Sequence, residues 1–210
     1  PDYFGGAPYL DQVIILFPRP DEHDAGNARF SRREIEIVEP TSDTLSSMLA
    51  DPTIEVHRYQ DLSLRFLGMN TGVPPLDDAR VRRAIAFAID RKSLAGLSPS
   101  TRREAQGILP PGLPSYSPEA KALPFDRDAA SRLLAEAGHP GGRGLAPLRL
   151  FLAKAGSDAA VKSKEQLRAD FAAIGINLEV HEVTWRELNS RIESHDAPLF
   201  QLGWVADLPD

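Results

Sequence analysis

Three short apolar runs in the first third of the chain predict β-strands. Residues 13–17 form a continuous run rich in β-branched side chains, as in a strand that is buried on both faces. Residues 35–38 form a second run, and residues 54–58 alternate apolar and polar positions as a half-buried strand does. Helical patterns at residues 24–33 and 41–51 separate these runs. We therefore expect strand pairs in the earlier part of the chain.

The middle third contains the clearest amphipathic helix. An alternating strand pattern at residues 62–70 precedes it, and Asp77 or Asp78 is positioned to cap it. Its apolar positions recur at helical spacing, opposite a charged face, at Val81, Ala84, Ile85, Ala88 and Ile89. Residues 96–118 are rich in proline, which predicts a long loop because proline breaks both helices and central strands. A helix capped by Asp126 is expected to follow this loop.

The last third alternates strands with helices. Strand patterns lie at residues 148–152, 176–180 and 199–204, and helices that begin after the capping residues Ser157 and Thr184 separate them. This order, together with the strand pairs before it, predicts an α/β layer fold with a mixed sheet. The sequence has no internal repeat and no composition break, so we expect residues 1–210 to form a single domain.

The composition is that of a globular protein with an acidic surface. Hydrophobic residues make up 42% of the 210 positions and charged residues 26%, which allows a substantial core. The formal net charge of -6 argues against a nucleic-acid partner, which would need a basic surface. No apolar run approaches the roughly 20 residues that span a bilayer, and no signal-peptide pattern opens the chain. Because the chain starts abruptly at Pro1, we expect it to be part of a longer protein.

The sequence carries no recognisable catalytic or metal-binding pattern. It contains no cysteine, which excludes a thiol nucleophile, a disulfide and a cysteine-based zinc site. No serine stands in a Gly-x-Ser-x-Gly elbow, and the five histidines are scattered without a His-x-x-x-His pair. We therefore expect no enzyme activity, no bound metal and no cofactor.

The end of the chain carries the strongest candidate for a binding site. The strand pattern at residues 199–204 ends in Trp204, and Asp207 follows in a turn. A carboxylate that follows a strand of an open α/β sheet lies where such sheets bind ligands. The alternative is a core strand that runs into an ordinary surface turn, since Asp and Pro are common turn residues.

Trp185, the second of two tryptophans, is open to the same two interpretations. It lies in a predicted helix that begins with a capping box formed by Thr184 and Glu187. It shares a helix face with Leu188 and Ile192, which favours a place in the core. An indole near a strand end can equally line a ligand pocket.

Six segments, in order along the chain, form a pattern that is specific only when they are taken together. They are residues 67–70 (LGMN), 74–85 (PPLDDARVRRAI), 88–92 (AIDRK), 109–112 (LPPG), 130–138 (ASRLLAEAG) and 203–207 (GWVAD). Their order and spacing resemble the solute-binding proteins of bacterial ABC importers, family 5, the peptide- and nickel-binding class. The resemblance extends over nearly the whole chain.

The resemblance implies a fold and a site. It implies that residues 1–210 are the inserted ligand-binding lobe of a two-lobe protein, with the mixed sheet of a type II periplasmic binding protein-like fold and with the other lobe absent. Solute would bind in the cleft between the lobes. Asp207 would receive the α-ammonium of a peptide, and Trp204 and Trp185 would line its side-chain pockets. Gln201 stands near the position where some relatives carry an arginine that meets the ligand carboxylate.

The resemblance also implies partners and location. The parent protein would be a monomer that binds oligopeptide-like solutes and delivers them to the membrane permease of an ABC importer. It would be periplasmic, or extracellular and tethered to a membrane. Two alternatives come from other classes: a solute-sensing domain of a transcription regulator, in which a helix-turn-helix would precede the lobe, and a hydrolase with an unfamiliar site.

Overall fold

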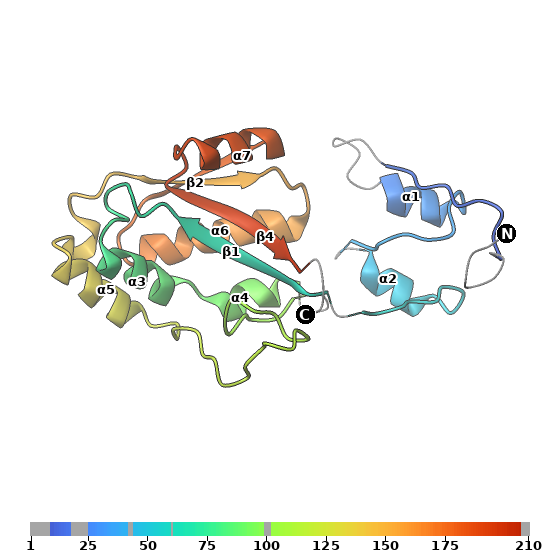
Figure 1. Cartoon of the computed structure of the whole chain (residues 1–210), viewed down its shortest axis with the longest axis horizontal. Coiled ribbons are helices and arrows are strands. Elements are labelled where there is room, and N and C mark those ends of the chain that lie inside the picture. The colour runs from blue at the N-terminus through green and yellow to red at the C-terminus, as the bar shows by residue number, and fades with distance from the viewer. Residues whose placement is uncertain (1–8, 18–24, 42–43, 60, 99–101, 207–210) are drawn as a thin grey trace.

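A four-stranded mixed sheet forms the centre of the molecule. The computed structural model describes residues 9–17, 25–41, 44–59, 61–98 and 102–206. Its strands are β1 (Ser63–Met69), β2 (Leu148–Ala153), β3 (Leu178–Val183) and β4 (Leu199–Val205), in the order β1-β4-β2-β3. β2 runs parallel to β3 and β4, whereas β1 is antiparallel to β4. Figure 1 shows the arrowheads of β1 and β4 pointing in opposite directions. The predicted mixed α/β sheet is confirmed.

Seven α-helices and one 3-10 helix accompany this sheet in the described part of the chain. They are α1 (Ala25–Ser31), α2 (Leu45–Ala50), α3 (Ala79–Ala88), α4 (Arg91–Gly96), α5 (Arg127–Glu136), η1 (Pro140–Gly142), α6 (Asp158–Ala173) and α7 (Trp185–Glu193). None of the helices described is both long and apolar enough to cross a membrane.

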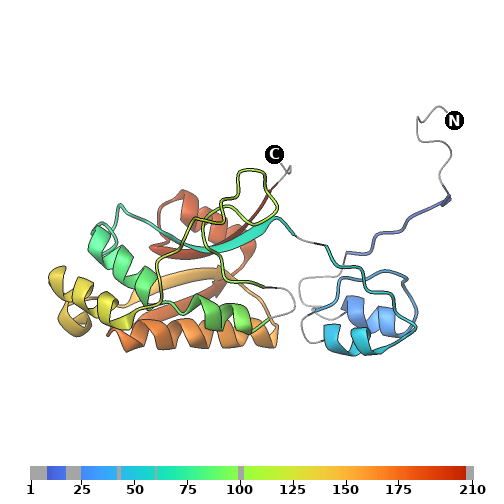
Figure 2. The same ribbon diagram turned by 90° about the horizontal axis from the view of Figure 1, so that it is seen from below.

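Helices cover both faces of the sheet, so the central strand β2 is buried on both sides. Figure 2 shows α6 and α7 on opposite faces. Leu148, Leu150 and Leu152 of β2 belong to the larger core, which includes residues of α3, α5 and α6. Phe151 points the other way, into a smaller core that contains Leu188 of α7. This alternation follows from the two-residue period of a strand.

Side-chain caps set the start of the long helices, as the sequence predicts. The carboxylates of Asp78 and Asp126 accept hydrogen bonds from backbone N–H groups in the first turns of α3 and α5, and the Ser157 hydroxyl does so in α6. These groups would otherwise lack partners, because the first turn of a helix has no preceding carbonyls. The predicted loop over residues 96–118 is also confirmed for its described part, except that Gly96 still belongs to α4 (Arg91–Gly96).

The buried carboxylate of Asp170 joins three segments of the larger core. Asp170, in α6, is fully buried and accepts a hydrogen bond of 3.0 Å from the backbone N–H of Asp90, between α3 and α4. It also accepts from Gln166 at 3.0 Å and from Arg127 of α5 at 3.3 Å. These donors compensate for the loss of hydration of the carboxylate.

The three strands predicted in the first third are wrong. Residues 13–17, 35–38 and 54–58 lie outside the four strands of the sheet, and the side chains of residues 13–17 are exposed. A strand requires a partner for its backbone groups, and no strand of the described structure pairs with these runs. Figures 1 and 2 both show α1 and α2 set apart from the sheet.

Helix starts and strand ends differ from the predictions at two further places. α2 begins at Leu45 after Thr44, rather than directly after Thr41 or Ser42. β3 extends to Val183, beyond its predicted end at residue 180. β3 is an edge strand, so its polar positions lie on a partly solvated surface and do not terminate it.

Candidate ligand-binding edge

The carboxyl ends of three parallel strands lie along one edge of the sheet. β2 ends at Ala153, which pairs with Val183 at the end of β3. β4 is in register with β2 through the pair Phe151 and Phe200, and it ends at Val205. This edge is where open α/β sheets bind ligands.

Trp204 lies at this edge and is 42% exposed. β4 begins with fully buried Leu199 and becomes exposed over its last three residues. Trp204 pairs with Leu64 of β1. The interpretation of Trp204 as a core residue is therefore wrong, and its indole is available for contact.

Gln201 projects from the face of the sheet opposite to Trp204, because the two positions differ by an odd number along one strand. Gln201 is partly buried and pairs with Leu67, which packs against the larger core. Trp204 shares its face with Phe200 and Leu202, which pack against the smaller core. The sheet thus separates two of the predicted site residues.

Trp185 is also exposed, at 58%, and it opens α7 directly after β3. The two residues predicted to share its helix face are less exposed: Leu188 is fully buried, and Ile192 packs against the smaller core. The Thr184 hydroxyl accepts from the Glu187 N–H at 3.2 Å, whereas the Glu187 carboxylate accepts from Arg191. Only the Thr184 half of the predicted capping box forms among the described residues. Trp185 and Trp204 therefore lie exposed at the same edge of the sheet.

Lys154 is a charged residue at this edge that the sequence patterns did not single out. It follows β2 directly, and its backbone N–H donates to the Val183 carbonyl at 3.0 Å. Its side chain is exposed and forms no ion pair with the described residues. β2 lies between β4, which carries Trp204, and β3, which Trp185 follows. The Lys154 ammonium therefore follows the strand that lies between these two. A lysine after a strand has no distinctive local pattern, which is why only the sheet order reveals it.

Asp207 lies outside the described residues, two positions beyond the end of β4. Its assignment as the acceptor for a ligand ammonium stays a prediction. No group of three or more His, Cys, Asp or Glu side chains could hold a metal ion within the described ranges.

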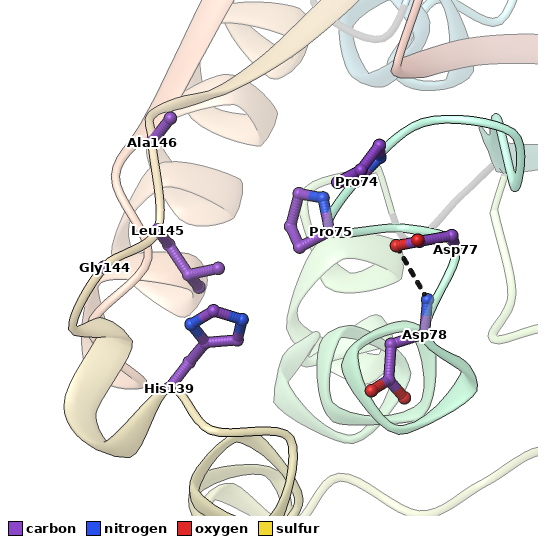
Figure 3. A pocket seen from close by; sticks show the side chains of 8 residues that line it. All are labelled: Pro74, Pro75, Asp77, Asp78, His139, Gly144, Leu145 and Ala146. Carbon is purple, nitrogen blue, oxygen red and sulfur yellow. Dashed lines mark hydrogen bonds between the residues drawn. The ribbon is translucent and has the colours of Figure 1, made fainter.

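A surface pocket of about 400 Å³ lies at the opposite edge of the sheet. Figure 3 shows Pro74 and Pro75 facing His139 and Leu145 across it. None of the predicted ligand-binding residues lines this pocket. The segment that contains the two prolines follows the end of β1, and Leu145 precedes the start of β2.

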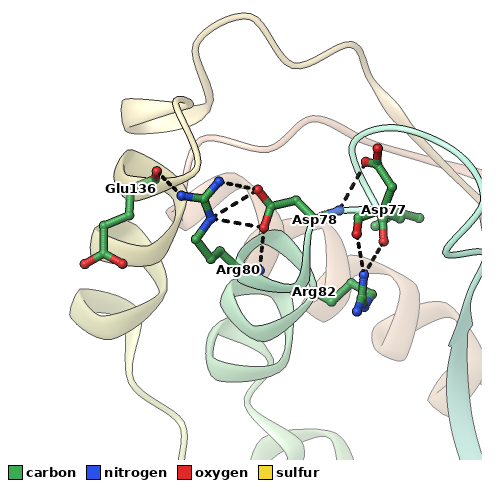
Figure 4. A network of polar contacts seen from close by, with 6 residues as sticks. Asp77, Asp78, Arg80, Arg82 and Glu136 are labelled. Atoms are coloured by element: carbon green, nitrogen blue, oxygen red, sulfur yellow. Dashed lines mark hydrogen bonds and ion pairs between the residues drawn. The ribbon is translucent and has the colours of Figure 1, made fainter.

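An ion pair and several hydrogen bonds join the segments at the rim of this pocket. Arg80 lies between Asp78 and the Glu136 carbonyl, to which it donates at 2.6 Å, and it thereby joins α3 to the end of α5 (Figure 4). The side chain and backbone N–H of Arg80 donate to Asp78 and lower the pKa of this carboxyl from 3.8 to about 2. Arg82 donates to the carbonyls of Leu76 and Asp77.

A protein-family model matches the chain over its full length. The model of the bacterial extracellular solute-binding proteins, family 5, matches residues 1–210. The chain belongs to this family. Its members and structural neighbours are solute-binding proteins rather than enzymes.

Individual relatives agree with the family assignment and extend beyond the chain. The probable di/tripeptide-binding protein 5 of Pseudomonas aeruginosa is 31% identical over 215 residues, which cover 100% of this chain and 39% of the relative. The chain thus spans about two fifths of the length of such relatives.

Two solved structures share the fold and part of the sequence. A dipeptide-binding protein from Pseudoalteromonas sp. SM9913 in complex with Met-Leu has a TM-score of 0.78 and 28% identity over 90% of this chain and 38% of its own. NikA from Brucella suis in complex with Fe(III)-EDTA has a TM-score of 0.78 and 25% identity over 98% of this chain and 44% of its own. The predicted fold class is confirmed by these neighbours.

Proposed function

We propose that the chain supplies one lobe of an ABC importer's periplasmic receptor for short peptides or peptide-like solutes. The observation that carries this proposal is the pair of exposed tryptophans, Trp185 and Trp204, at the carboxyl edge of the sheet. Buried tryptophans would have indicated only a core. Membership of a solute-binding family and relatives named for di- and tripeptides support a solute at this edge.

The chemistry of the edge suits a peptide with free ends. Indole faces accept apolar side chains of different shapes, because their contacts are not directional. The exposed ammonium of Lys154 can pair with a ligand carboxylate, and the carboxylate of Asp207 with a ligand ammonium. A peptide is a solute that carries both charges and apolar side chains.

The solute would bind between this lobe and polypeptide that the 210 residues do not include. Closure over the solute would strengthen both ion pairs, since charges attract more strongly where water is excluded. The membrane permease of the importer would then receive the closed, monomeric receptor. We infer the periplasmic location and the permease partner from the class of proteins to which the relatives belong.

Calorimetry on the full-length protein with a library of di- and tripeptides tests the proposal. We expect Asp207→Ala to weaken binding of a free peptide by roughly 10- to 100-fold, the range of one charge-assisted hydrogen bond. N-acetylation of the peptide should weaken binding to the wild type by a similar factor and have little further effect on Asp207→Ala. Unchanged affinity of Asp207→Ala would refute the role of this residue.

The same design tests Lys154 with C-amidated peptides. Lys154→Ala should lose affinity for free peptides and be insensitive to amidation. Asp128→Ala, which removes an exposed carboxylate from the first turn of α5, serves as the control and should bind as the wild type does. Tight binding of Fe(III)-EDTA with no measurable binding of any peptide would overturn the peptide assignment.

A further inference from the structure

Two arginines near the carboxyl edge of the sheet have no acidic partner among the described residues. Arg65 is exposed on β1, and Arg102 is half-buried in the loop that follows α4. Figures 1 and 2 both show this loop passing beside β1. Neither guanidinium forms an ion pair or a side-chain hydrogen bond with the described residues. Glu104, the nearest acid in this loop, pairs instead with Arg91 at 3.5 Å.

Arg65 projects from the face of the sheet that carries the larger core. Leu67, two positions further along β1, packs against that core, and a strand repeats its faces every two residues. Ser63 at the start of β1 pairs with Val205 at the end of β4. Arg65 therefore lies at the same edge of the sheet as the candidate site.

The residue opposite Arg65 leaves a space beside its guanidinium. Arg65 pairs with Gly203 of β4, which has no side chain. Among the described atoms beyond its chain neighbours, a Cβ at position 203 would have only the Leu64 carbonyl oxygen within 4 Å, at 3.9 Å. Gln201 borders this space from the same face, because it pairs with Leu67, and its amide forms no hydrogen bond with the described residues. Guanidinium and amide N–H donors thus surround the space.

The positive charge of this group is not compensated within the described residues. Burial lowers the pKa of the Arg102 guanidinium, and the nearby charge of Arg65 lowers it further. Both side chains stay charged at neutral pH, since the usual pKa of arginine is above about 12. Repulsion between like charges and the loss of hydration both raise the free energy of this arrangement. A bound anion would relieve both.

We propose that Arg65, Arg102 and Gln201 form a subsite for an anionic side chain of the solute, such as the carboxylate of a glutamate or aspartate in a peptide. Guanidinium groups bind carboxylates through paired, charge-assisted hydrogen bonds. This inference rests on the proposed function and narrows its solute class. Lys154 and Asp207 bind the two ends of the peptide, and the subsite adds a preference for acidic peptides.

Calorimetry on the full-length protein with matched tripeptides tests the preference. The peptides are Glu-Ala-Ala, Ala-Glu-Ala and Ala-Ala-Glu, each beside its glutamine counterpart. We expect at least one glutamate peptide to bind about 10- to 100-fold more tightly than its counterpart, the range of a charge-assisted hydrogen bond. The double variant Arg65→Gln/Arg102→Gln should lose this ratio. Arg168→Gln, which removes an exposed charge from α6, is the control and should retain it.

Two outcomes of this experiment would overturn the proposal. One is the same glutamate-to-glutamine ratio in the wild type and in the double arginine variant. The other is that C-amidation of Ala-Ala-Ala weakens binding to the wild type but not to the double variant. In that case the arginines bind the terminal carboxylate rather than a side chain.

A second measurement uses no peptide, so its result does not depend on the proposed function. At constant ionic strength, inorganic phosphate should raise the Tm of the full-length protein by about 2 °C or more above its value in chloride, because a bound anion stabilises the native state. The double arginine variant should lose this shift. Gln201→Glu places a carboxylate beside the arginines, so it should raise the Tm in chloride and remove the phosphate effect.

The two measurements separate the two proposals. A phosphate shift that depends on both arginines, together with no binding of any peptide, would refute the peptide assignment and support an anion site for another solute. A phosphate shift of the same size in the wild type, the double arginine variant and Gln201→Glu would overturn the anion subsite, whatever the peptides do.

Discussion

Gly68 of β1 lies directly opposite Phe200 of β4, and the Phe200 ring occupies the space above it. A Cβ atom at position 68 would come within 2.1 Å of this ring, far inside van der Waals contact. The ring also packs against the smaller core. Glycine is needed at this position for space rather than for its backbone conformation.

We expect Gly68→Ala to destabilise the protein by about 1–3 kcal/mol, because the ring must shift within a packed layer. Urea denaturation measures this loss. The double variant Gly68→Ala/Phe200→Leu should recover part of it, since the smaller side chain leaves space for the methyl group. Gly96→Ala is the control, because a Cβ there meets nothing within 4 Å. Equal stability of Gly68→Ala and wild type would contradict the predicted overlap.

Asp78 both caps α3 and pairs with Arg80, and these contacts lower its pKa to about 2. A carboxyl with a lowered folded-state pKa stabilises the protein fully above its unfolded pKa of about 3.9. Protonation removes this stabilisation as the pH falls toward 2. The network in Figure 4 therefore predicts a defined step in acid stability.

We expect Asp78→Asn to flatten the fall in stability between about pH 4 and pH 2, because asparagine does not titrate there. Urea midpoints measured across this range test the prediction. Asp77→Asn is the matched control, since the Asp77 side chain accepts from the Asp78 N–H and leaves the Arg80 pair intact. Parallel pH profiles for Asp78→Asn and the wild type would show that the pair adds no pH-dependent stability.

The helices on the larger core are joined at the carboxylate of Asp170. One oxygen accepts from Gln166 and Arg127, and the other accepts from the backbone of Asp90 at the junction of α3 and α4. Contacts between the apolar faces of these helices would by themselves allow small rotations of the helices. The shared carboxylate fixes the position of this junction against α6.

Asp170→Ala should lower the free energy of unfolding by about 1–3 kcal/mol, because it leaves the Asp90 N–H and the Arg127 guanidinium without their acceptor. Asp170→Asn retains one oxygen and should lose less. Denaturant unfolding of both variants, beside Asp128→Ala as an exposed control, provides the measurement. If Asp170→Ala lowers the free energy of unfolding no more than Asp128→Ala does, the buried carboxylate does not stabilise the core.

Under the proposed function, the chain forms only part of the binding site, and the longer protein supplies the rest. Its candidate site is an edge with two exposed indoles and a lysine that forms no ion pair with the described residues. Solute contacts made by one lobe alone leave the other side of the solute in water.

We therefore expect the isolated 210-residue chain to bind peptides at least 100-fold more weakly than the full-length protein. Calorimetry of both proteins with the same dipeptide measures the difference. Micromolar binding by the isolated chain would contradict this expectation and would indicate that the edge is a complete site.

Local patterns in the sequence were sufficient for the four strands, for the helices α3, α5, α6 and α7, and for the family. The short helices α4 and η1 were not predicted. The caps at Asp78, Asp126 and Ser157 depend on residues within one turn, and a strand period depends on side chains two positions apart. The sequence also placed Trp204 at the end of a strand and Trp185 at the start of a helix.

Only the tertiary structure decided whether each pattern had a partner. The apolar runs at residues 13–17 and 148–152 predict the same element, yet one is exposed and the other is the centre of the sheet. The exposure of Trp204, the separation of Gln201 onto the other face and the position of Lys154 depended equally on the tertiary structure. The physical reason is that strand pairing and burial are made between residues far apart in the chain, whereas capping and periodicity are local.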